Sequence, residues 1–337
     1  MDSTAMQPEN GMLQGLDFSG QDLSERSFAG MRLENCRFDG ANLASCDFTR
    51  AVVTGCRFDG ADLTDSTFDE AKLENVSLKN AAMGHASLVR AHLAHADMSG
   101  AKLERALLLE TVLSDVIWPE VSLTQATLRG LSALPDFENA DLTMTQCLQC
   151  ELSGLRLVRT KAHLLTLQSC RGQGIFCEDD DLTQLIAMQT DLSGSSFLRC
   201  RMAKAGLMGS NLSRCRFSGS DLSEAHLEES RLALACLAGV SLPKAGLAGS
   251  DLSGADFSGA DLTMADLSHV TAEHARFSGA TLTMANLHAA DLARADMSGA
   301  DLSSARKTDP ALLRAERFKP SLTIMGKGCG PITDPST

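Results

Sequence analysis

Leu and Phe recur every five residues along most of this chain, and that period excludes the two commonest regular structures. The series begins with Leu13, Phe18, Leu23 and Phe28 and continues by fives to Leu128. An α-helix turns about 100° per residue, so this repeat would distribute the apolar side chains around every side of it. A straight strand alternates its faces with a period of two, so every second Leu or Phe would point the opposite way. The period therefore predicts short extended segments joined by corners.

A second period gives the number of sides. Phe18, Phe38 and Phe58 lie twenty residues apart, whereas a three-sided coil would place Phe18 against Leu33. We therefore expect coils of four five-residue sides, stacked as parallel strands about 4.8 Å apart. The series predicts about 14 such coils and a rod of about 70 Å. The predicted structural core includes Phe18, Phe38, Phe58, Phe197, Phe217, Leu252, Phe257, Leu262 and Phe277.

The clearest copies of the repeat lie between residues 250 and 262, where Ala-Asp-Leu-Ser-Gly recurs with small changes. In an extended segment, Ala255 and Phe257 point to the same side and Asp256 to the other. Ser258 and Gly259 are turn residues. The unit therefore predicts two inward side chains, one outward carboxylate and a corner.

This pattern, written Ala-(Asp/Asn)-Leu-x-x and present over residues 13–305, resembles that of the pentapeptide-repeat family. The resemblance implies an all-β fold, a right-handed quadrilateral parallel β-helix. Residues 1–12 are then a lead-in or cap, and residues 306–337 a short helix with an extended tail. Asp309 and Pro310 suit the N-cap and first turn of that helix. We expect the helix to plug the last coil, or to serve as a dimer contact or docking element.

The period slips by one residue within 129–136, where Leu128 and Phe137 are nine residues apart. Gly130 and Pro135 in this segment predict a bulge or a small projecting loop. A tolerated one-residue deletion with a slight kink is the alternative.

The repeat is also weaker over residues 145–191, where Asp180 falls on an inward position among Glu178, Asp179 and Asp181. An isolated ionised carboxylate in an apolar core is very costly. We therefore expect irregular coils around residues 172–181 and an outward deviation of this turn. It is interpreted as a solvated bulge, with a local acidic patch or cation site as the alternative.

No residue pattern indicates catalysis or a cofactor. Cys147 and Cys150 form the one Cys-x-x-Cys, but a zinc site needs further ligands, and both residues fall on inward positions. The odd number of cysteines, 11, favours reduced core thiols over a disulfide framework. His85 and His95 are predicted to lie on opposite sides of a coil. The chain is therefore predicted not to be an enzyme, with a metal-dependent enzyme using the acids of 178–181 as a remote alternative.

The net charge of −13 leaves two functional readings. The first is a non-enzymatic scaffold or adaptor that binds a protein through the faces of an acidic rod, as in secretion-associated or effector-type relatives. The second is taken from the resemblance, because some relatives mimic DNA, bind gyrase and protect it from quinolones, usually as dimers joined through C-terminal helices. Duplex DNA carries one charge per about 1.7 Å, so mimicry requires the acids to gather on one face. Candidate interaction residues are Asp59, Asp62, Asp65, Asp69, Glu178, Asp179, Asp180, Leu312, Leu313 and Phe318.

The expected partner is a protein, with a homodimer through the C-terminal helix as a further alternative, and neither nucleic acid nor membrane is expected to bind directly. The N-terminus shows no secretory signal, and no stretch approaches the roughly 18 apolar residues of a membrane span. The predicted location is the bacterial cytoplasm, and secretion as an effector without a cleavable signal stays open.

Overall fold

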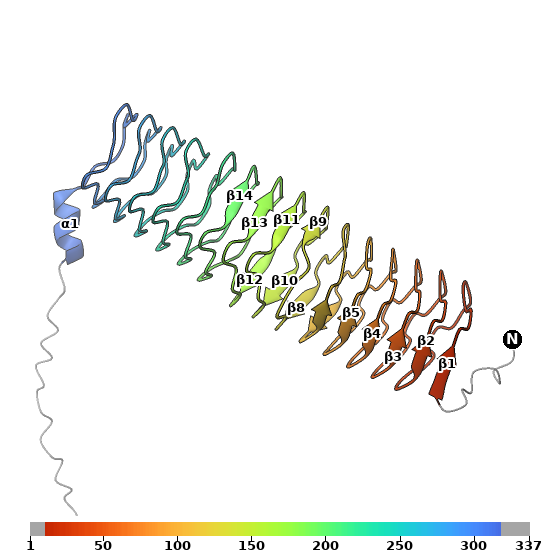
Figure 1. Ribbon diagram of the computed structural model, residues 1–337. Helices are drawn as coiled ribbons and strands as arrows, with labels where there is room; N and C mark the ends of the chain where they lie inside the picture. Colours follow the sequence, from red (N-terminus) through yellow and green to blue (C-terminus); the bar gives the residue numbers. More distant parts are fainter. Residues whose placement is uncertain (1–10, 318–337) are drawn as a thin grey trace, which may run out of the picture.

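Short strands stacked side by side make up the rod seen in the computed structural model, which describes residues 11–317 (Figure 1). The predictions for residues 1–10, Phe318 and 319–337 lie outside the described residues. The strands are β1 (Met12–Gln14), β2 (Arg32–Glu34), β3 (Val52–Thr54), β4 (Lys72–Glu74), β5 (His92–Ala94), β6 (Leu107–Leu109), β7 (Val112–Ser114), β8 (Thr127–Arg129), β9 (Phe137–Glu138), β10 (Gln146–Leu148), β11 (Arg156–Val158), β12 (Thr166–Gln168), β13 (Phe176–Glu178) and β14 (Ser196–Leu198), followed by helix α1 (Pro310–Arg317).

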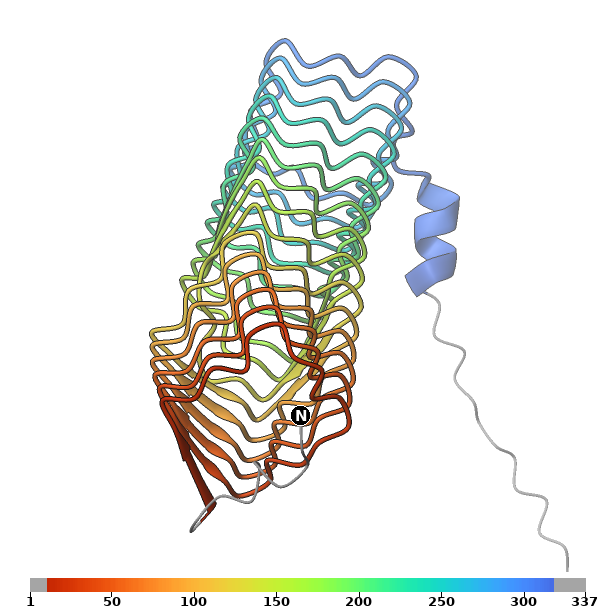
Figure 2. The same cartoon turned by 90° about the vertical axis from the view of Figure 1, so that its right-hand side faces the viewer.

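Neighbouring coils pair in parallel, and outside one slip the partners lie twenty residues apart. Leu13 pairs with Leu33 near the start, and Asp256 pairs with Arg276 near the end. We name the four sides of the rod by their strands. Face A carries β1–β5 and β7, face B carries β9, β11, β13 and β14, and face D carries β6, β8, β10 and β12. Face C, between B and D, contains isolated bridges such as Asp62 with Ala82. Figure 2 shows these coils stacked along the rod, and the predicted class, a parallel β-helix with a short C-terminal helix, is confirmed.

The interior is a set of like-on-like columns. Phe18, Phe38 and Phe58 stack with ring centroids 5.1 and 4.9 Å apart. A second stack, Phe28–Phe48–Phe68, has spacings of 4.8 and 4.7 Å. Offset stacking adds about 0.5–1.5 kcal/mol per aromatic pair beyond area burial. All nine residues of the predicted core are buried.

The corners explain why Asp and Gly recur in the repeat. The Asp256 carboxylate is half-buried and accepts a hydrogen bond from the Ser258 backbone N–H at 3.0 Å, which fixes the turn. The corner ends on a residue with positive φ, 65° at Gly259 and 51° at Asn35. Gly adopts this conformation without the clash that a Cβ causes, and Asn tolerates it better than most residues. The outward Asp thus has a structural role besides its charge.

The slip at 129–136 is a one-residue deletion, and it falls on face A. Ser122 pairs with Asp141, nineteen residues on, after which the twenty-residue spacing returns. Strand β7 ends the sheet of face A, and no strand pairs with it at residues 131–136. Leu134 and Pro135 are half-buried, and the Trp118 indole N–H donates to the Pro135 carbonyl at 3.4 Å. The segment therefore forms a short loop held against the rod.

The weak repeats of residues 145–191 keep their volume by exchanging large and small side chains. Gly172 stands where a central Leu is expected, and Ile175 stands where a small residue is expected. A Cβ added at Gly172 would lie 2.8 Å from Ile175 Cδ1 and 2.9 Å from Leu192 Cδ2, so these two side chains fill the space. The parallel pairing between coils continues across this segment, since Arg171 pairs with Asp191.

Helix α1 has the predicted cap. The Asp309 carboxylate accepts the backbone N–H groups of Ala311 at 2.8 Å and Leu312 at 3.3 Å. Capping of this kind satisfies donors that have no partner within the helix. The start of the helix is therefore specified locally.

The helix lies beside the last coil rather than across its end (Figures 1 and 2). The Thr308 hydroxyl accepts the Ala289 N–H at 3.1 Å, which draws the chain onto the side of the rod. Leu292, Met297 and Leu302 of the final coil are only half-buried. The plug expected at residues 310–317 is therefore not formed by the described residues.

Candidate functional site

The acids singled out in the first coils surround one coil instead of sharing a face. Asp59 lies on face B, Asp62 on face C and Asp69 on face D, while Asp65 is at the corner between C and D. Asp62 accepts the Thr64 N–H at 3.0 Å, and Asp69 accepts the Val89 N–H at 3.1 Å. These carboxylates fix turns and neighbouring coils on three different sides.

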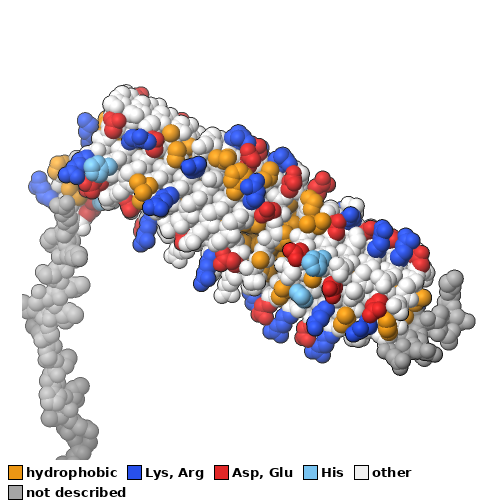
Figure 3. Space-filling view, viewed as in Figure 1, with side chains coloured by type: hydrophobic (Ala, Val, Ile, Leu, Met, Phe, Trp, Pro, Cys, Tyr) orange, Lys and Arg blue, Asp and Glu red, His pale blue; other side chains and the backbone are white. Residues whose placement is uncertain are grey.

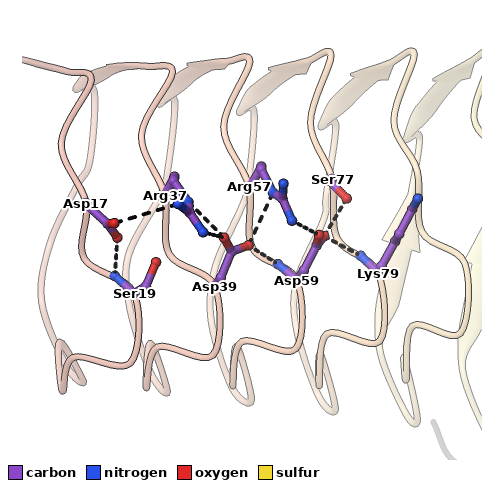
Figure 4. Close-up of polar contacts among 8 residues, drawn as sticks. All are labelled: Asp17, Ser19, Arg37, Asp39, Arg57, Asp59, Ser77 and Lys79. Atoms are coloured by element: carbon purple, nitrogen blue, oxygen red, sulfur yellow. Dashed lines mark hydrogen bonds and ion pairs between the residues drawn. The ribbon is translucent and has the colours of Figure 1, made fainter.

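On face B the acids are also matched by bases (Figure 4). The Arg57 guanidinium lies 3.4 Å from an Asp39 oxygen and 2.8 Å from Asp59. Arg37 contacts Asp39 at 2.9 Å and Asp17 at 3.9 Å. Figure 3 shows basic and acidic side chains interspersed over the visible side of the rod. Over residues 17–59 this face is a ladder of ion pairs and does not present a line of unpaired charge.

The acids of 178–181 overturn the expected outward bulge. Asp180 is 1% exposed and points inward. Its two oxygens accept the Thr160 N–H at 2.6 Å and the Glu178 N–H at 2.9 Å. Burial raises the pKa of Asp180 to about 6, in spite of these hydrogen bonds. The coil keeps its course because the buried carboxylate has two donors and a raised pKa, which lower the cost of burying it.

The neighbouring acids pair with one arginine. Arg199 contacts Glu178 at 2.6 Å and Asp179 at 2.7 Å. The hydrogen bond from Arg199 lowers the pKa of Asp179. Because Asp180 faces inward and the other two acids face a guanidinium, the structure does not bring these carboxylates together as a cation site.

The buried hydrogen bond to Asp180 belongs to a pattern that sequence reasoning missed. In other repeats the inward position two residues before the central Leu or Phe carries Cys or Ser. The side chain of that residue accepts a hydrogen bond from the backbone N–H of the residue stacked on it in the preceding coil. Cys200 N–H donates to Ser220 Oγ at 2.9 Å, and Cys150 N–H donates to Cys170 Sγ at 3.4 Å. Cys147 faces inward as predicted, and burial raises its thiol pKa. These thiols and hydroxyls satisfy backbone donors that would otherwise be buried without partners.

A His-His-Glu cluster forms where α1 meets the rod. His269 and His288 project from successive coils of face D, and Glu316 comes from α1. Their ligand atoms lie within 4.8 Å of one another. His269 Nε2 is 3.4 Å and His288 Nε2 is 3.3 Å from Glu316 Oε2. These separations are compatible with ligands of a tetrahedral zinc ion.

The hydrogen bonds of His288 favour a different role. Its Nδ1 accepts the Asp309 N–H at 3.1 Å, which assigns the proton to Nε2, facing Glu316. A metal on Nε2 would move that proton to Nδ1, where it would point at the Asp309 N–H. His288, 6% exposed, therefore joins both ends of α1 to the rod. We call this group the His288 clasp.

Replacing His288 by Ala should release α1. A helix of this length is marginal in water without tertiary contacts, so backbone amides 313–316 should exchange at least about tenfold faster in H288A. Hydrogen exchange with mass spectrometry measures this. His274→Ala, an exposed His on another side of the rod, should leave the rate unchanged. Unchanged protection in H288A would contradict the clasp.

Leu312 and Leu313 occupy different positions on this helix. Leu312 is 49% exposed and borders the hollow around the His288 clasp, whereas Leu313 is half-buried. Leu312 therefore leaves part of its side chain available to a partner.

The surface with the most distinctive composition lies on face D between residues 146 and 209, and sequence reasoning did not identify it. Its outward residues, in 146–149, 166–169, 186–189 and 206–209, include no Asp, Glu, Lys or Arg. Met188 is 52% exposed, Met208 41% and Ile186 37%. We call this surface the uncharged patch.

The uncharged patch is hollowed. Thr166, Gln168, Ile186, Met188 and Met208 line the hollow, and Glu229 borders it. Over the same coils face C carries Lys161, Asp181 and Arg201, and face A carries Glu151, Arg171 and Asp191. Reading the outward positions of one side at twenty-residue spacing would have revealed this contrast.

Comparisons with known proteins give the following matches. The family model described as pentapeptide repeats matches, in 8 copies, residues 27–65, 41–80, 71–108, 188–219, 210–246, 235–271 and 273–306. A search of curated proteins found no significant match. No helix among residues 11–317 is long and apolar enough to cross a membrane.

Two solved structures illustrate the similarity. HetL, involved in heterocyst differentiation regulation in the cyanobacterium Nostoc sp. strain PCC 7120, is 23% identical over 87% of this chain and 89% of its own, with a TM-score of 0.15. QnrB1, a plasmid-mediated fluoroquinolone resistance protein, is 17% identical over 91% of this chain and 97% of its own, with a TM-score of 0.19. At these scores neither supports an argument about function.

Proposed function

Since the chain belongs to the pentapeptide-repeat family, we propose that it is a non-enzymatic scaffold or adaptor that binds a protein through the uncharged patch of face D. One observation carries the proposal: exposed Met188, Met208 and Ile186 share a hollow on the uncharged patch, and Glu229 borders this hollow from the next coil. Exposed apolar surface of this kind is typical of interaction sites.

The side chains of the patch suit a protein partner. Methionine is unbranched and polarizable, so Met188 and Met208 can adjust to an apolar surface. Gly209 lines the same hollow, and neither Gly206 nor Gly209 adds a side chain beside Met208. The net charge of −13 opposes contact with the phosphates of nucleic acid and with anionic lipid surfaces. The partner is therefore a protein that presents an uncharged, partly apolar surface.

The test is a charge placed inside the hollow. A Met188→Glu variant would have to desolvate a carboxylate to bind, so it should lose proteins that the wild-type chain captures. Met264→Glu is the matched control, since Met264 is 47% exposed at a corner far along the rod. Affinity capture with quantitative mass spectrometry compares the three proteins. Equal capture by wild type and M188E would contradict the proposal.

The alternative is gyrase binding by DNA mimicry. The ion pairs of face B and the distribution of Asp59, Asp62 and Asp69 over three sides count against it. A supercoiling assay with gyrase, with and without a quinolone, decides between the two. Protection of gyrase that persists in M188E would favour mimicry.

A further inference from the structure

The two ends of the uncharged patch carry opposite charges. Arg129 is exposed on face D, one coil before the patch. Glu228 follows on the same face, one coil after the patch. Opposite charges at the two ends of an apolar surface are complementary to the same surface turned end for end.

Glu228 also lacks a full set of partners. One of its carboxylate oxygens lies 3.4 Å from His226 Nδ1. The other oxygen is buried and has no hydrogen-bond partner among residues 11–317. The side chain lies over Gly246, since a Cβ there would collide with it. The buried oxygen is out of reach of a second molecule in this conformation, but 27% of the side chain is exposed, so a guanidinium can approach the carboxylate from outside.

Side-chain size along face D shows the same complementarity. Before Arg129, the side presents Leu107 and Leu109, and Leu107 is 40% exposed. The coil after Glu228 presents Gly246 and Ala248 at the corresponding positions. In an antiparallel pair of identical faces, Leu109 would meet Ala248, and Leu107 would meet Gly246 once Glu228, which lies over Gly246, turns toward Arg129 of the other copy.

We propose that two copies of this chain pack antiparallel through face D, about a twofold axis between the coils of Leu167 and Ala187. The inference rests on the proposed function, because it names a second copy as the occupant of the uncharged patch. Across the axis, Arg129 of each copy meets Glu228 of the other. Leu148 meets Met208, and Leu107 and Leu109 meet Gly246 and Ala248.

This surface is also where two such rods repel each other least. Each copy carries a net charge of −13, so most side-by-side contacts bring like charges together. The uncharged patch keeps ionised groups away from the centre of the contact. At a coil spacing of about 4.8 Å, the contact from Leu108 to Leu247 would extend about 34 Å along the rod. An isologous contact of this kind closes as a dimer.

The test reverses the charge of Arg129 or Glu228 and measures dimer formation by sedimentation velocity over a series of protein concentrations. The wild-type chain should dimerise as concentration rises. R129E and E228R should each raise the dimer dissociation constant at least about tenfold, because like charges then meet twice. R214E makes the same charge change on an exposed corner between faces A and B and should behave as wild type.

Mixing the two variants tests directly whether Arg129 of one copy contacts Glu228 of the other. In an equimolar mixture of R129E and E228R, both cross-interface pairs become opposite in charge, so heterodimers should form with near wild-type affinity. The double variant R129E/E228R should also dimerise. Restored association cannot arise from misfolded chains, and circular dichroism checks that each variant keeps its fold.

A wild-type chain that stays monomeric throughout the series, or a mixture that fails to restore association, would overturn the dimer. The proposed function fails separately. A monomeric wild type whose M188E variant still loses captured proteins removes only the dimer. A wild-type dimer whose captured proteins are unaffected by M188E keeps the dimer and removes the wider adaptor role.

Discussion

Phe48→Ala should destabilise the rod by about 3–5 kcal/mol, the range for truncating a buried Phe. Phe48 is fully buried and stacks on Phe28 at 4.8 Å and on Phe68 at 4.7 Å, with Phe58 edge-on at 6.1 Å. Neighbouring coils are held by the register of their pairs and cannot collapse into the space. The loss therefore includes a cavity as well as the aromatic contacts.

Phe277→Ala is the matched control for that prediction. Phe277 is also buried, but it stacks on one ring, Phe257, at 5.1 Å and lies near the open end of the rod. Its replacement should cost less, because fewer aromatic contacts are lost and the last coils can relax. Urea unfolding followed by circular dichroism measures both variants. If Phe48→Ala lowers the free energy of unfolding by no more than Phe277→Ala does, the claim that the stacked Phe columns stabilise the rod is contradicted.

Asp180→Ser should stabilise the protein above pH 6 and have little effect near pH 4. The pKa of Asp180 is raised from 3.8 to about 6, chiefly by burial. When the pKa of a carboxyl group is higher in the folded state than in the unfolded state, the protonated group favours the folded state at low pH. This contribution to the free energy of unfolding is complete below the unfolded-state pKa and is lost as the pH rises through the folded-state pKa. A shift of about two pKa units corresponds to about 3 kcal/mol lost between about pH 4 and pH 7.

Ser is the appropriate replacement, because Ser220 occupies the same inward column and accepts the Cys200 N–H at 2.9 Å. D180S should therefore keep an acceptor for the Thr160 N–H without a buried charge. Asp180→Ala removes that acceptor and should be less stable than D180S at every pH. Thermal unfolding at about pH 4 and about pH 8 tests the sign. A wild-type advantage over D180S that grows with pH would contradict it.

How far the sequence specifies the structure differs between inward and outward positions. Phe18, Phe38 and Phe58 could be placed in one column because inward residues repeat with the coil. Asp180 could not, because its tolerance depends on two backbone N–H groups that become available only after neighbouring coils are stacked. A pattern of hydrophobic residues contains no information about such donors.

The position of α1 and the uncharged patch were missed for related reasons. The cap of α1 is local, so Asp309 was predicted, but the side of the rod it meets depends on His288 and Glu316, which are 28 residues apart. The outward residues of face D obey no period that folding requires. Their lack of charge shows only when the outward residues, such as Met188 and Met208, are read at the twenty-residue spacing of one face, and the hydrophobic repeat alone does not direct attention to them.

The most direct test of the account is oxidative footprinting of the exposed methionines, because the chain provides its own reference. Met188 and Met208 in the uncharged patch are 52% and 41% exposed, and Met264 and Met284 outside it are 47% and 51% exposed. Dilute, purified chain should oxidise at comparable rates at all four sites. In the assembled state, isolated from cells without denaturation, Met188 and Met208 should be protected while Met264 and Met284 are not. Equal oxidation of all four in that state would contradict the claim that the uncharged patch of face D is the binding surface.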